Sequence, residues 1–316
     1  MALPFGEISA ITHPMINESS ADNIYASNPT FMQIKERGSV IMSGGSQIQL
    51  PIDYAKISAA GSYADYDVLD TTPNATQNAA KYDWRQYYAN VVVSMADLLK
   101  NSGESQAVNL LKGKVENAQR KLRDVLGTDL FSANADSATG IVGLRQLVKA
   151  SGQVGNVNSS DFAGWASDID AATSALTLSA MEQQFLDAEV AGDFPDMIVT
   201  TKGVWGKLWN LLQANQRFAA AQVGKGGFRY LMFNDVPVFH DSHCPGSSTS
   251  SSTADKHMFF LNSKWLYLFV HKDDNFVVEE MPRIAQQRVH IDQISVTLAF
   301  GTDNRRMHSA FTVLKH

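Results

Sequence analysis

The fold of this chain is decided by Gly38–Ser94, "GSVIMSGGSQIQLPIDYAKISAAGSYADYDVLDTTPNATQNAAKYDWRQYYANVVVS". After a tip rich in Ala, Gly, Ser, Asp and Thr, a second β-like run extends over Tyr82–Val93. Before the tip stands a short alternating run of larger side chains: Ile48, Leu50, Ile52 and Tyr54. The pattern predicts a long β-hairpin whose tip has too few apolar side chains to form a core. Because an isolated two-stranded ribbon is marginal in water, we expect something outside the segment to hold it.

The segments on either side of the hairpin differ in character. Residues 1–36 alternate short apolar groups with prolines, which predicts an extended arm with little structure of its own. After the hairpin, Ser94–Asp97 resembles a capping box that opens a short helix ended by Gly103. A long helix over 105–127, closed by Gly127, is predicted by an apolar stripe at three- and four-residue steps: Val108, Leu111, Val115, Ala118, Leu122 and Val125.

The remaining faces of this long helix are mostly basic. They carry Lys112, Lys114, Glu116, Arg120, Lys121 and Arg123. Two interpretations are open: the basic residues contact nucleic acid, or they form a solvated face. The solvated face is the commoner role of charged residues on an amphipathic helix, and we favour it.

The central part of the chain, beyond the long helix, alternates loops, helices and a strand. A helix is predicted to run to about Val190, with a capping box at Ser179–Glu182 and a stop at Gly192. The sequence "DMIVTT", Asp196–Thr201, predicts a buried strand, and an amphipathic helix follows over 203–218.

The C-terminal part of the chain has the pattern of β-structure. Asn234 and Asp235 tolerate left-handed backbone, so they predict the two-residue turn of a hairpin. Three further strands are expected in His257–Met281, and a last hairpin in Arg288–Leu314. Helices mixed with largely antiparallel strands place the chain in the α+β class.

Composition excludes several classes of protein. The chain has 316 residues and a net charge of −6, from 32 acidic and 26 basic residues, which argues against a protein whose main task is to grip nucleic acid. Its single cysteine excludes an intrachain disulfide framework and a multi-cysteine zinc site. The first twenty residues lack a signal-peptide pattern, and no segment approaches the roughly 20 apolar residues that cross a bilayer. We therefore expect a soluble protein made in the cytosol.

One cluster of residues has the chemistry of an active or metal site. His240, Asp241, His243 and Cys244 stand within five positions, and Asp241 and His243 would share one face of a strand. A zinc ion needs three or four ligands, so His257 or His271 would have to contribute. The simpler interpretation is a strand that ends in a loop.

Other catalytic signatures are missing from the sequence. It contains no phosphate-binding loop, no dinucleotide-binding glycine pattern and no nucleophile elbow. Trp205 and Trp209 could stack on a ligand, but at helical spacing such residues are usually core. The pairs Asp273–Asp274 and Glu279–Glu280 are expected at turns or strand ends, without a convergent partner. We therefore predict that the protein is not an enzyme and uses no cofactor or metal.

The order of these segments resembles the major capsid proteins of tailed bacteriophages, which have the Hong Kong 97 fold. The resemblance covers most of the chain from about residue 36, and no single motif in it is diagnostic. It rests on "ERGSVIMSGGSQIQLPIDY", "AAKYDWRQYYANVVVSMADLLKNSG", "AVNLLKGKVENAQRKLRDVLGTDLF", "DMIVTTKGVWGKLWNLLQANQRF", "GGFRYLMFNDVPVFHDSHCP" and "NRRMHSAFTVL".

The resemblance implies a division into domains. Residues 1–36 would be the N-terminal arm and 44–85 the E-loop, the extended hairpin that lies across a neighbouring subunit. The peripheral domain would comprise 86–131, with its spine helix 105–127, and 276–300. The axial domain would comprise 132–275 and 301–316.

The resemblance also implies contacts and partners. Subunit contacts are expected at Lys56, Tyr63, Asp65, Tyr66 and Asp67, and an inner-surface helix face at Lys112, Arg120, Lys121 and Arg123. The chain would assemble with itself into pentamers and hexamers of an icosahedral shell around phage double-stranded DNA. It would be synthesised in the host cytoplasm and reside in the virion capsid. A separate scaffolding protein, a portal and decoration proteins would be its partners, without a membrane.

Two alternatives stay open. One is an encapsulin-type compartment, which has the same fold but encloses a cellular cargo enzyme. The other is a metal-dependent hydrolase centred on His240–Cys244.

Overall fold

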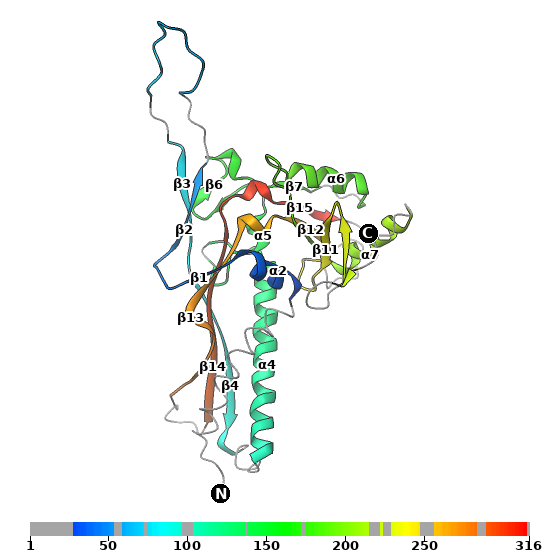
Figure 1. Cartoon of the computed structure of the whole chain (residues 1–316). Helices are drawn as coiled ribbons and strands as arrows, with labels where there is room; N and C mark the ends of the chain where they lie inside the picture. Colours follow the sequence, from blue (N-terminus) through cyan, green and yellow to red (C-terminus); the bar gives the residue numbers. More distant parts are fainter. Residues whose placement is uncertain are drawn as a thin grey trace.

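The computed structural model describes ten ranges of the chain: 28–53, 59–72, 75–96, 104–136, 138–171, 175–214, 222–223, 229–246, 256–282 and 289–314. Three long strands lie alongside the longest helix, a seven-stranded sheet with its own helices lies beside them, and a hairpin projects beyond both (Figure 1). This mixture confirms the α+β class. Within the described ranges, no helix is both long and apolar enough to cross a membrane.

A four-stranded sheet and a long helix form one half of the molecule. The helix, α4, covers Glu104–Leu130 and packs along β4, as Figure 1 shows. The apolar stripe predicted for it is buried at Val115 and Leu122. The β-run predicted over Tyr82–Val93 divides in two, because Tyr82 ends the projecting hairpin and β4 begins at Arg85. The strands in sheet order are β1 (Ser39–Met42), β13 (Leu266–Glu280), β14 (Val289–Thr302) and β4 (Arg85–Ser94).

The predicted end of the long helix at Gly127 is wrong, since α4 continues through that glycine to Leu130. A glycine is needed at position 127 because the side chains of Asn28 and His243 approach the helix backbone closely there. A Cβ atom at this position would lie 2.7 Å from Asn28 Nδ2 and 2.7 Å from His243 Nδ1, closer than side-chain carbons come to such atoms. The short preceding helix includes Met95 and Ala96, and its predicted end at Gly103 lies outside the described residues.

The extended arm predicted over 1–36 is wrong at its C-terminal end, because Pro29–Gly38 form a helix, α2. The side chain of Asn28 accepts a hydrogen bond from the Phe31 amide at 3.4 Å, and Pro29 at the first helical position needs no amide proton. Phe31 and Ile34 are buried in the main core. Residues 1–27 lie outside the described ranges.

The second half is built on a sheet of seven strands. β8 is buried along its whole length, which confirms the strand predicted at Asp196–Thr201. The turn between β10 and β11 has positive φ at Asn234 (47°) and Asp235 (62°), as predicted for a two-residue hairpin turn. The strands in sheet order are β7 (Asp168–Asp170), β15 (Ser309–Leu314), β12 (Lys256–Leu261), β8 (Met197–Thr200), β11 (Val236–His240), β10 (Arg229–Phe233) and β9 (Gln222–Val223).

Two helices pack on this sheet and form a second apolar cluster with it. The helix α7, Lys202–Ala214, confirms the predicted amphipathic helix, and Trp205 and Trp209 stack at 6.0 Å against the cluster. The other helix, α6, covers Leu178–Asp187, and its cap is Thr177, whose hydroxyl accepts from the Ala180 amide at 3.2 Å. The predicted capping box at Ser179–Glu182 and the end near Val190 are therefore wrong by two or three residues.

Two predictions for the C-terminal strands are also wrong. His257–Met281 holds two strands, because β13 continues through Asp273 and Asp274 with a register shift and a positive φ of 55° at Phe276. The last two strands form no hairpin: β14 belongs to the four-stranded sheet and β15 to the seven-stranded sheet. Short elements complete the described fold: α5 (Leu144–Leu147), β5 (Gln153–Val154), β6 (Val157–Asn158), η1 (Ala163–Trp165), η3 (Ser263–Trp265) and η4 (Arg305–Met307).

Candidate functional site

The projecting hairpin is the feature that best distinguishes this molecule from an ordinary globular domain. Its strands β2 (Ile48–Asp53) and β3 (Gln77–Tyr82) pair in antiparallel register, from Ile48 opposite Tyr82 to Asp53 opposite Gln77. Near the body, one face of the hairpin belongs to the main core through Ile48, Ile52, Ala80 and Tyr82. The hairpin is therefore partly core and partly projection.

The tip of the hairpin is fully exposed, since every residue from 60 to 72 lies on the surface. Tyr66 is 99% exposed and Val68 98%. The Asp67 amide donates to the Ala64 carbonyl at 2.9 Å and the Ala64 amide to Asp67 Oδ2 at 2.9 Å, so a β-turn holds Asp65 and Tyr66 at its centre. Four of the predicted contact residues, Tyr63, Asp65, Tyr66 and Asp67, share this exposed tip; the fifth, Lys56, lies outside the described residues.

The root of the hairpin is clamped to the body by a buried tyrosine. Tyr82 Oη donates to the Thr302 carbonyl at 2.7 Å and accepts from the Thr302 amide at 3.2 Å. Burial raises the pKa of the Tyr82 hydroxyl far above its ordinary value, so it stays protonated at neutral pH. The Lys81 amide also donates to the Gly155 carbonyl at 2.9 Å. These bonds fix where the hairpin leaves the body.

Gly155 meets the hairpin so closely that only glycine fits there. Its φ is +60°, and a Cβ atom would lie 2.9 Å from Ala80 Cβ. L-residues rarely adopt such a φ, and the backbone of Gly155 is what accepts the hydrogen bond from Lys81. The turn between β5 and β6 therefore supports the hairpin from the side.

The basic face predicted on the long helix is present but not uniform. Arg120 and Lys121 are exposed, Arg123 is half-buried, and Arg120 lies 3.8 Å from Glu116. Lys114 donates to the Val92 carbonyl at 2.9 Å and so ties α4 to β4. The side chain of Lys112 lies outside the described residues. Any nucleic-acid contact of this face stays a prediction.

The cluster at His240–Cys244 joins three elements of the fold. Asp241 is buried, and its Oδ2 accepts from the Thr30 hydroxyl of α2 at 2.6 Å. Its Oδ1 accepts from the His243 amide at 2.9 Å and lies 3.2 Å from His243 Nδ1, while His243 Nε2 lies 3.8 Å from Asp124 of α4. The prediction that these residues end a strand is correct, because β11 ends at His240, and His243 in the following loop contacts Asp241.

The protonation of this cluster follows from its contacts. Burial would raise the pKa of Asp241, but the hydrogen bonds from His243 and Thr30 lower it below its usual value. The Asp241 hydrogen bond raises the pKa of His243 above its ordinary value. Burial raises the pKa of the Cys244 thiol, so the thiolate needed for metal binding or nucleophilic attack is disfavoured.

The described residues do not bring metal ligands together in this cluster. His240 packs against the Trp205 ring, with 5.5 Å between the ring centroids. Across the described part of the chain, no group of three or more His, Cys, Asp or Glu side chains is placed to bind a metal. The cluster therefore works as a structural junction among α2, α4 and the end of β11.

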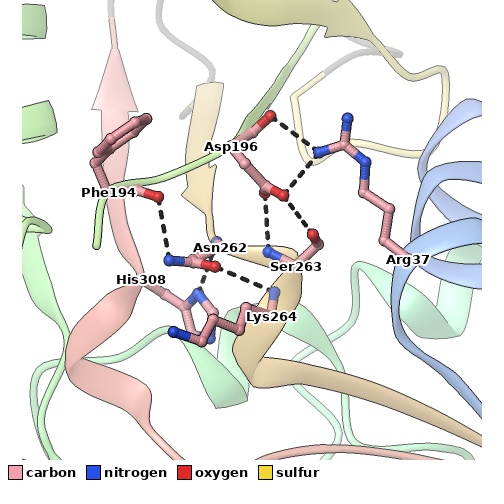
Figure 2. Close-up of polar contacts among 7 residues, drawn as sticks. All are labelled: Arg37, Phe194, Asp196, Asn262, Ser263, Lys264 and His308. Carbon is pink, nitrogen blue, oxygen red and sulfur yellow. Dashed lines mark hydrogen bonds and ion pairs between the residues drawn. The ribbon is translucent and has the colours of Figure 1, made fainter. Parts of the chain in front are cut away.

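A second junction fixes α2 to the seven-stranded sheet. Figure 2 shows Asp196, just before β8, between Arg37 of α2 and Ser263 of η3. Arg37 Nη1 lies 2.7 Å from Asp196 Oδ2, the Ser263 amide donates to Asp196 Oδ1 at 2.8 Å, and the Ser263 hydroxyl donates to Asp196 Oδ2. One carboxylate thus joins three segments that are distant in sequence.

Figure 2 brings a serine, a histidine and an aspartate into one region, Ser263, His308 and Asp196, but their contacts are not those of a catalytic triad. His308 Nδ1 accepts from the Asn262 amide at 3.3 Å, and its Nε2 lies 3.3 Å from the Thr302 hydroxyl oxygen. Burial lowers the pKa of His308 to about 3, which keeps it neutral. The Ser263 hydroxyl donates to Asp196, whereas a triad needs the serine on the histidine.

Sequence reasoning missed the residues that hold the hairpin root. The sequence predicts Tyr82 only as part of a β-run, because its hydrogen bond to Thr302 joins residues 220 positions apart and no local pattern indicates such a contact. Arg305 falls within the predicted last hairpin, yet it is fully buried and its hydrogen bonds hold the loops beside the root. Gly155 is a local signal for a turn, but the sequence does not indicate that this turn packs against the hairpin.

Comparison with known proteins supports the fold from an independent direction. No protein-family profile and no curated protein matches this sequence. Among solved structures, the capsid of cyanophage A-1(L) is similar at 13% identity over 88% of this chain and 90% of that chain, with a TM-score of 0.65. The capsid of a native GTA particle has 11% identity over 90% and 89%, with a TM-score of 0.64. The holo-SrpI encapsulin of Synechococcus elongatus has 10% identity over 90% and 87%, with a TM-score of 0.57.

These similar structures cover nearly the whole of both chains and belong to capsids and an encapsulin shell. The chain therefore has the Hong Kong 97-like fold, and the resemblance drawn from the order of its segments is confirmed. At these identities the likeness establishes the architecture, whereas the role of this particular chain has to be argued from its own residues.

Proposed function

We propose that this chain is the major capsid protein of a tailed bacteriophage, which assembles with copies of itself into an icosahedral shell of pentamers and hexamers around double-stranded DNA. The observation that carries the proposal is the hairpin, whose tip is exposed from residue 60 to 72 while its root is buried in the core. A projecting hairpin with an exposed tip is physically reasonable if the tip contacts another copy of the chain.

The contact expected from such a hairpin is heterologous, because the tip of one copy meets a different surface on the next. Heterologous contacts propagate from subunit to subunit and close into rings when the curvature permits. Many modest contacts around each subunit then give a stable shell, as in multivalent binding. The net charge of −6 suits a container that must not bind its DNA tightly. We assign to the inner surface the helix face with Lys112, Arg120, Lys121 and Arg123.

The proposal includes partners and a location. The chain would be made in the host cytoplasm and reside in the virion capsid, with a separate scaffolding protein, a portal and decoration proteins as partners. Lys56 would join Tyr63, Asp65, Tyr66 and Asp67 in the contact between subunits. The proposed domain borders are those given by the resemblance, except that Pro29–Gly38 form a helix and β13 begins at Leu266.

The proposal is tested by deleting Gly61–Asn78 from the full chain and examining particles by negative-stain electron microscopy. We expect a subunit that unfolds at nearly the same temperature as the wild type but forms no stable closed shells. A same-length replacement of 61–72 by Gly and Ser separates the effect of the side chains from that of length. Normal shells from the deletion variant would contradict the proposal.

An encapsulin-type compartment is the second candidate, because an encapsulin shell is among the similar structures. The two functions differ in what the particles enclose. Particles purified from the native source should contain phage DNA if the first proposal holds. Particles that instead co-purify with one cellular enzyme would assign the second.

A further inference from the structure

A pocket of about 360 Å³ lies at the root of the hairpin and is not used by any contact described above. Its lining includes three aromatic residues, Phe162, Trp165 and Trp265, together with Ile52 of β2. Asp303 and Arg306 line it from the turn between β14 and β15. The volume falls in the range of about 300–1,000 Å³ that is typical of binding pockets. We call these six residues the root socket.

The root socket is held in shape by Arg305. This arginine is fully buried, and its guanidinium donates to the carbonyls of Leu147 (2.8 Å), Trp165 (2.9 Å) and Lys149 (2.7 Å). The loop that carries Phe162 and Trp165 is thereby tied to the turn that carries Arg306. Because both walls are hydrogen-bonded to the Arg305 guanidinium, they are already ordered, and binding of an occupant carries no entropic cost for ordering them.

The hairpin tip has the complementary features. Its β-turn is already formed and presents Tyr66, 99% exposed, beside the exposed carboxylate of Asp65. Tyrosine is enriched among residues that dominate protein interfaces, because its ring buries a large area and its hydroxyl keeps a polar partner. A second copy of this chain would bring both groups to the socket.

We infer that the root socket receives the tip of the hairpin from a second copy of the chain, with Tyr66 against the aromatic walls and Asp65 paired with Arg306. This inference rests on the proposed shell function, and it identifies the surface of the neighbouring copy that the hairpin tip contacts. Arg306 is exposed, and among the described residues it has no ion pair. Asp53 and Asp303 also line the pocket and have the same charge sign as Asp65, so Arg306, the one basic residue among its lining residues, is the group with which an acidic tip can pair.

Length supports a contact between copies over a contact within one copy. Tyr66 is thirteen positions from Asp53, and a fully extended chain of that length would reach at most about 43 Å, at about 3.3 Å per residue. A compact chain of this size has a radius of gyration of about 20 Å, so touching neighbours lie about 40–50 Å apart. The hairpin also forms one wall of its own socket and extends away from it (Figure 1). The tip therefore reaches the socket of the next copy more readily than its own.

The first test places a cysteine on each side of the expected ion pair, Asp65→Cys with Arg306→Cys, in the full chain. The native Cys244 is buried and does not compete. After assembly and mild oxidation, we expect a ladder of covalent multimers on a denaturing gel. The matched control combines Asp65→Cys with Asn210→Cys, an exposed position on α7, and should stay monomeric on the gel. Assembled particles of the first variant that cross-link no better than the control would overturn the inference.

The second test remains informative if the cysteine variants fail to assemble. Arg306→Asp should reduce the yield of closed particles at least tenfold, and adding Asp65→Arg should restore it. Arg145→Asp, at another exposed arginine, is the control and should leave assembly unchanged. If the double variant is folded but not rescued, the pairing is wrong.

The two proposals fail in distinguishable ways. Wild-type protein that never forms particles would defeat the shell function itself. If the wild type forms particles but the variants show neither the expected cross-link nor the rescue, only the root socket is defeated. Mass spectrometry that finds the Arg306→Cys thiol joined to another segment of the chain would assign a different occupant and also overturn the inference.

Discussion

Two tyrosines of the same hairpin are placed in opposite environments. Tyr82, at the root, is 2% exposed and bonded to both backbone groups of Thr302, whereas Tyr66, at the tip, is 99% exposed. The same residue type therefore stabilises the subunit at one end and is available to another surface at the other. The comparison teaches that subunit stability and assembly are separated along this hairpin, so that changes at the root and at the tip should have different consequences.

The largest expected effect is at the root. Tyr82→Ala removes a buried ring from the main core, and such changes cost about 3–5 kcal/mol of unfolding free energy. Tyr66→Ala should leave the free energy of unfolding unchanged but reduce the yield of particles. Urea denaturation of both variants, with particle counts by electron microscopy, checks the pair. The separation of roles would be refuted if Tyr66→Ala destabilised the subunit as much as Tyr82→Ala.

A second comparison uses adjacent arginines beside the root. Arg305→Met leaves the buried carbonyls of Leu147 and Trp165 without their hydrogen-bond donor. Each buried acceptor without a partner costs about 1–3 kcal/mol of unfolding free energy. We expect a loss of roughly 2 kcal/mol or more for this variant, while Arg306→Met keeps wild-type stability because its side chain is exposed. Thermal unfolding measures both. Equal destabilisation by the two changes would show that Arg305 does not hold the socket walls.

Two glycines of α4 offer a smaller contrast. Gly127→Ala places a methyl group against Asn28 and His243, and such overpacking costs about 1–3 kcal/mol. Gly113→Ala meets nothing within 4 Å and should stabilise the helix by up to about 1 kcal/mol. The midpoint of chemical denaturation should therefore fall for Gly127→Ala and rise for Gly113→Ala. A stabilising Gly127→Ala would contradict the close approach between α4 and the start of α2.

The smallest expected effect depends on pH. Because its pKa is raised in the folded state by Asp241, His243 contributes stability that is complete below its unfolded pKa of about 6.5 and is lost as pH rises through the folded value. The stability difference between wild type and His243→Gln should therefore shrink as pH rises above about 6.5. Thermal unfolding from pH 6 to pH 9 measures the difference. A difference that grew with pH would reverse the assigned sign.

The sequence was sufficient for elements whose signal is local. The alternation at Ile48–Ile52, the stripe of the long helix and the left-handed pair Asn234–Asp235 each depend on neighbours a few positions away, and the structure has all three. The exposed tip was predictable for the same reason, because it has too few apolar side chains to form a core of its own.

The sequence failed where the deciding contact is distant. Gly127 has the pattern of a helix end, but its environment is set by Asn28 and His243. No periodicity in the sequence predicts that these two residues lie against the helix. β14 and β15 resemble a hairpin because one turn separates them, yet they belong to different sheets, and the buried Arg305 lies in the turn between them. The root socket combines residues from four separate segments, so it could be found only in three dimensions.

The central claim is that the projecting hairpin is stabilised on a sister copy. Cryo-electron microscopy of the purified wild-type chain, expressed with a scaffolding protein if one is required, tests it most directly. The account predicts closed particles of uniform diameter in which residues 60–72 of each copy rest on the neighbouring subunit. It is contradicted by a map in which each hairpin folds back onto its own body.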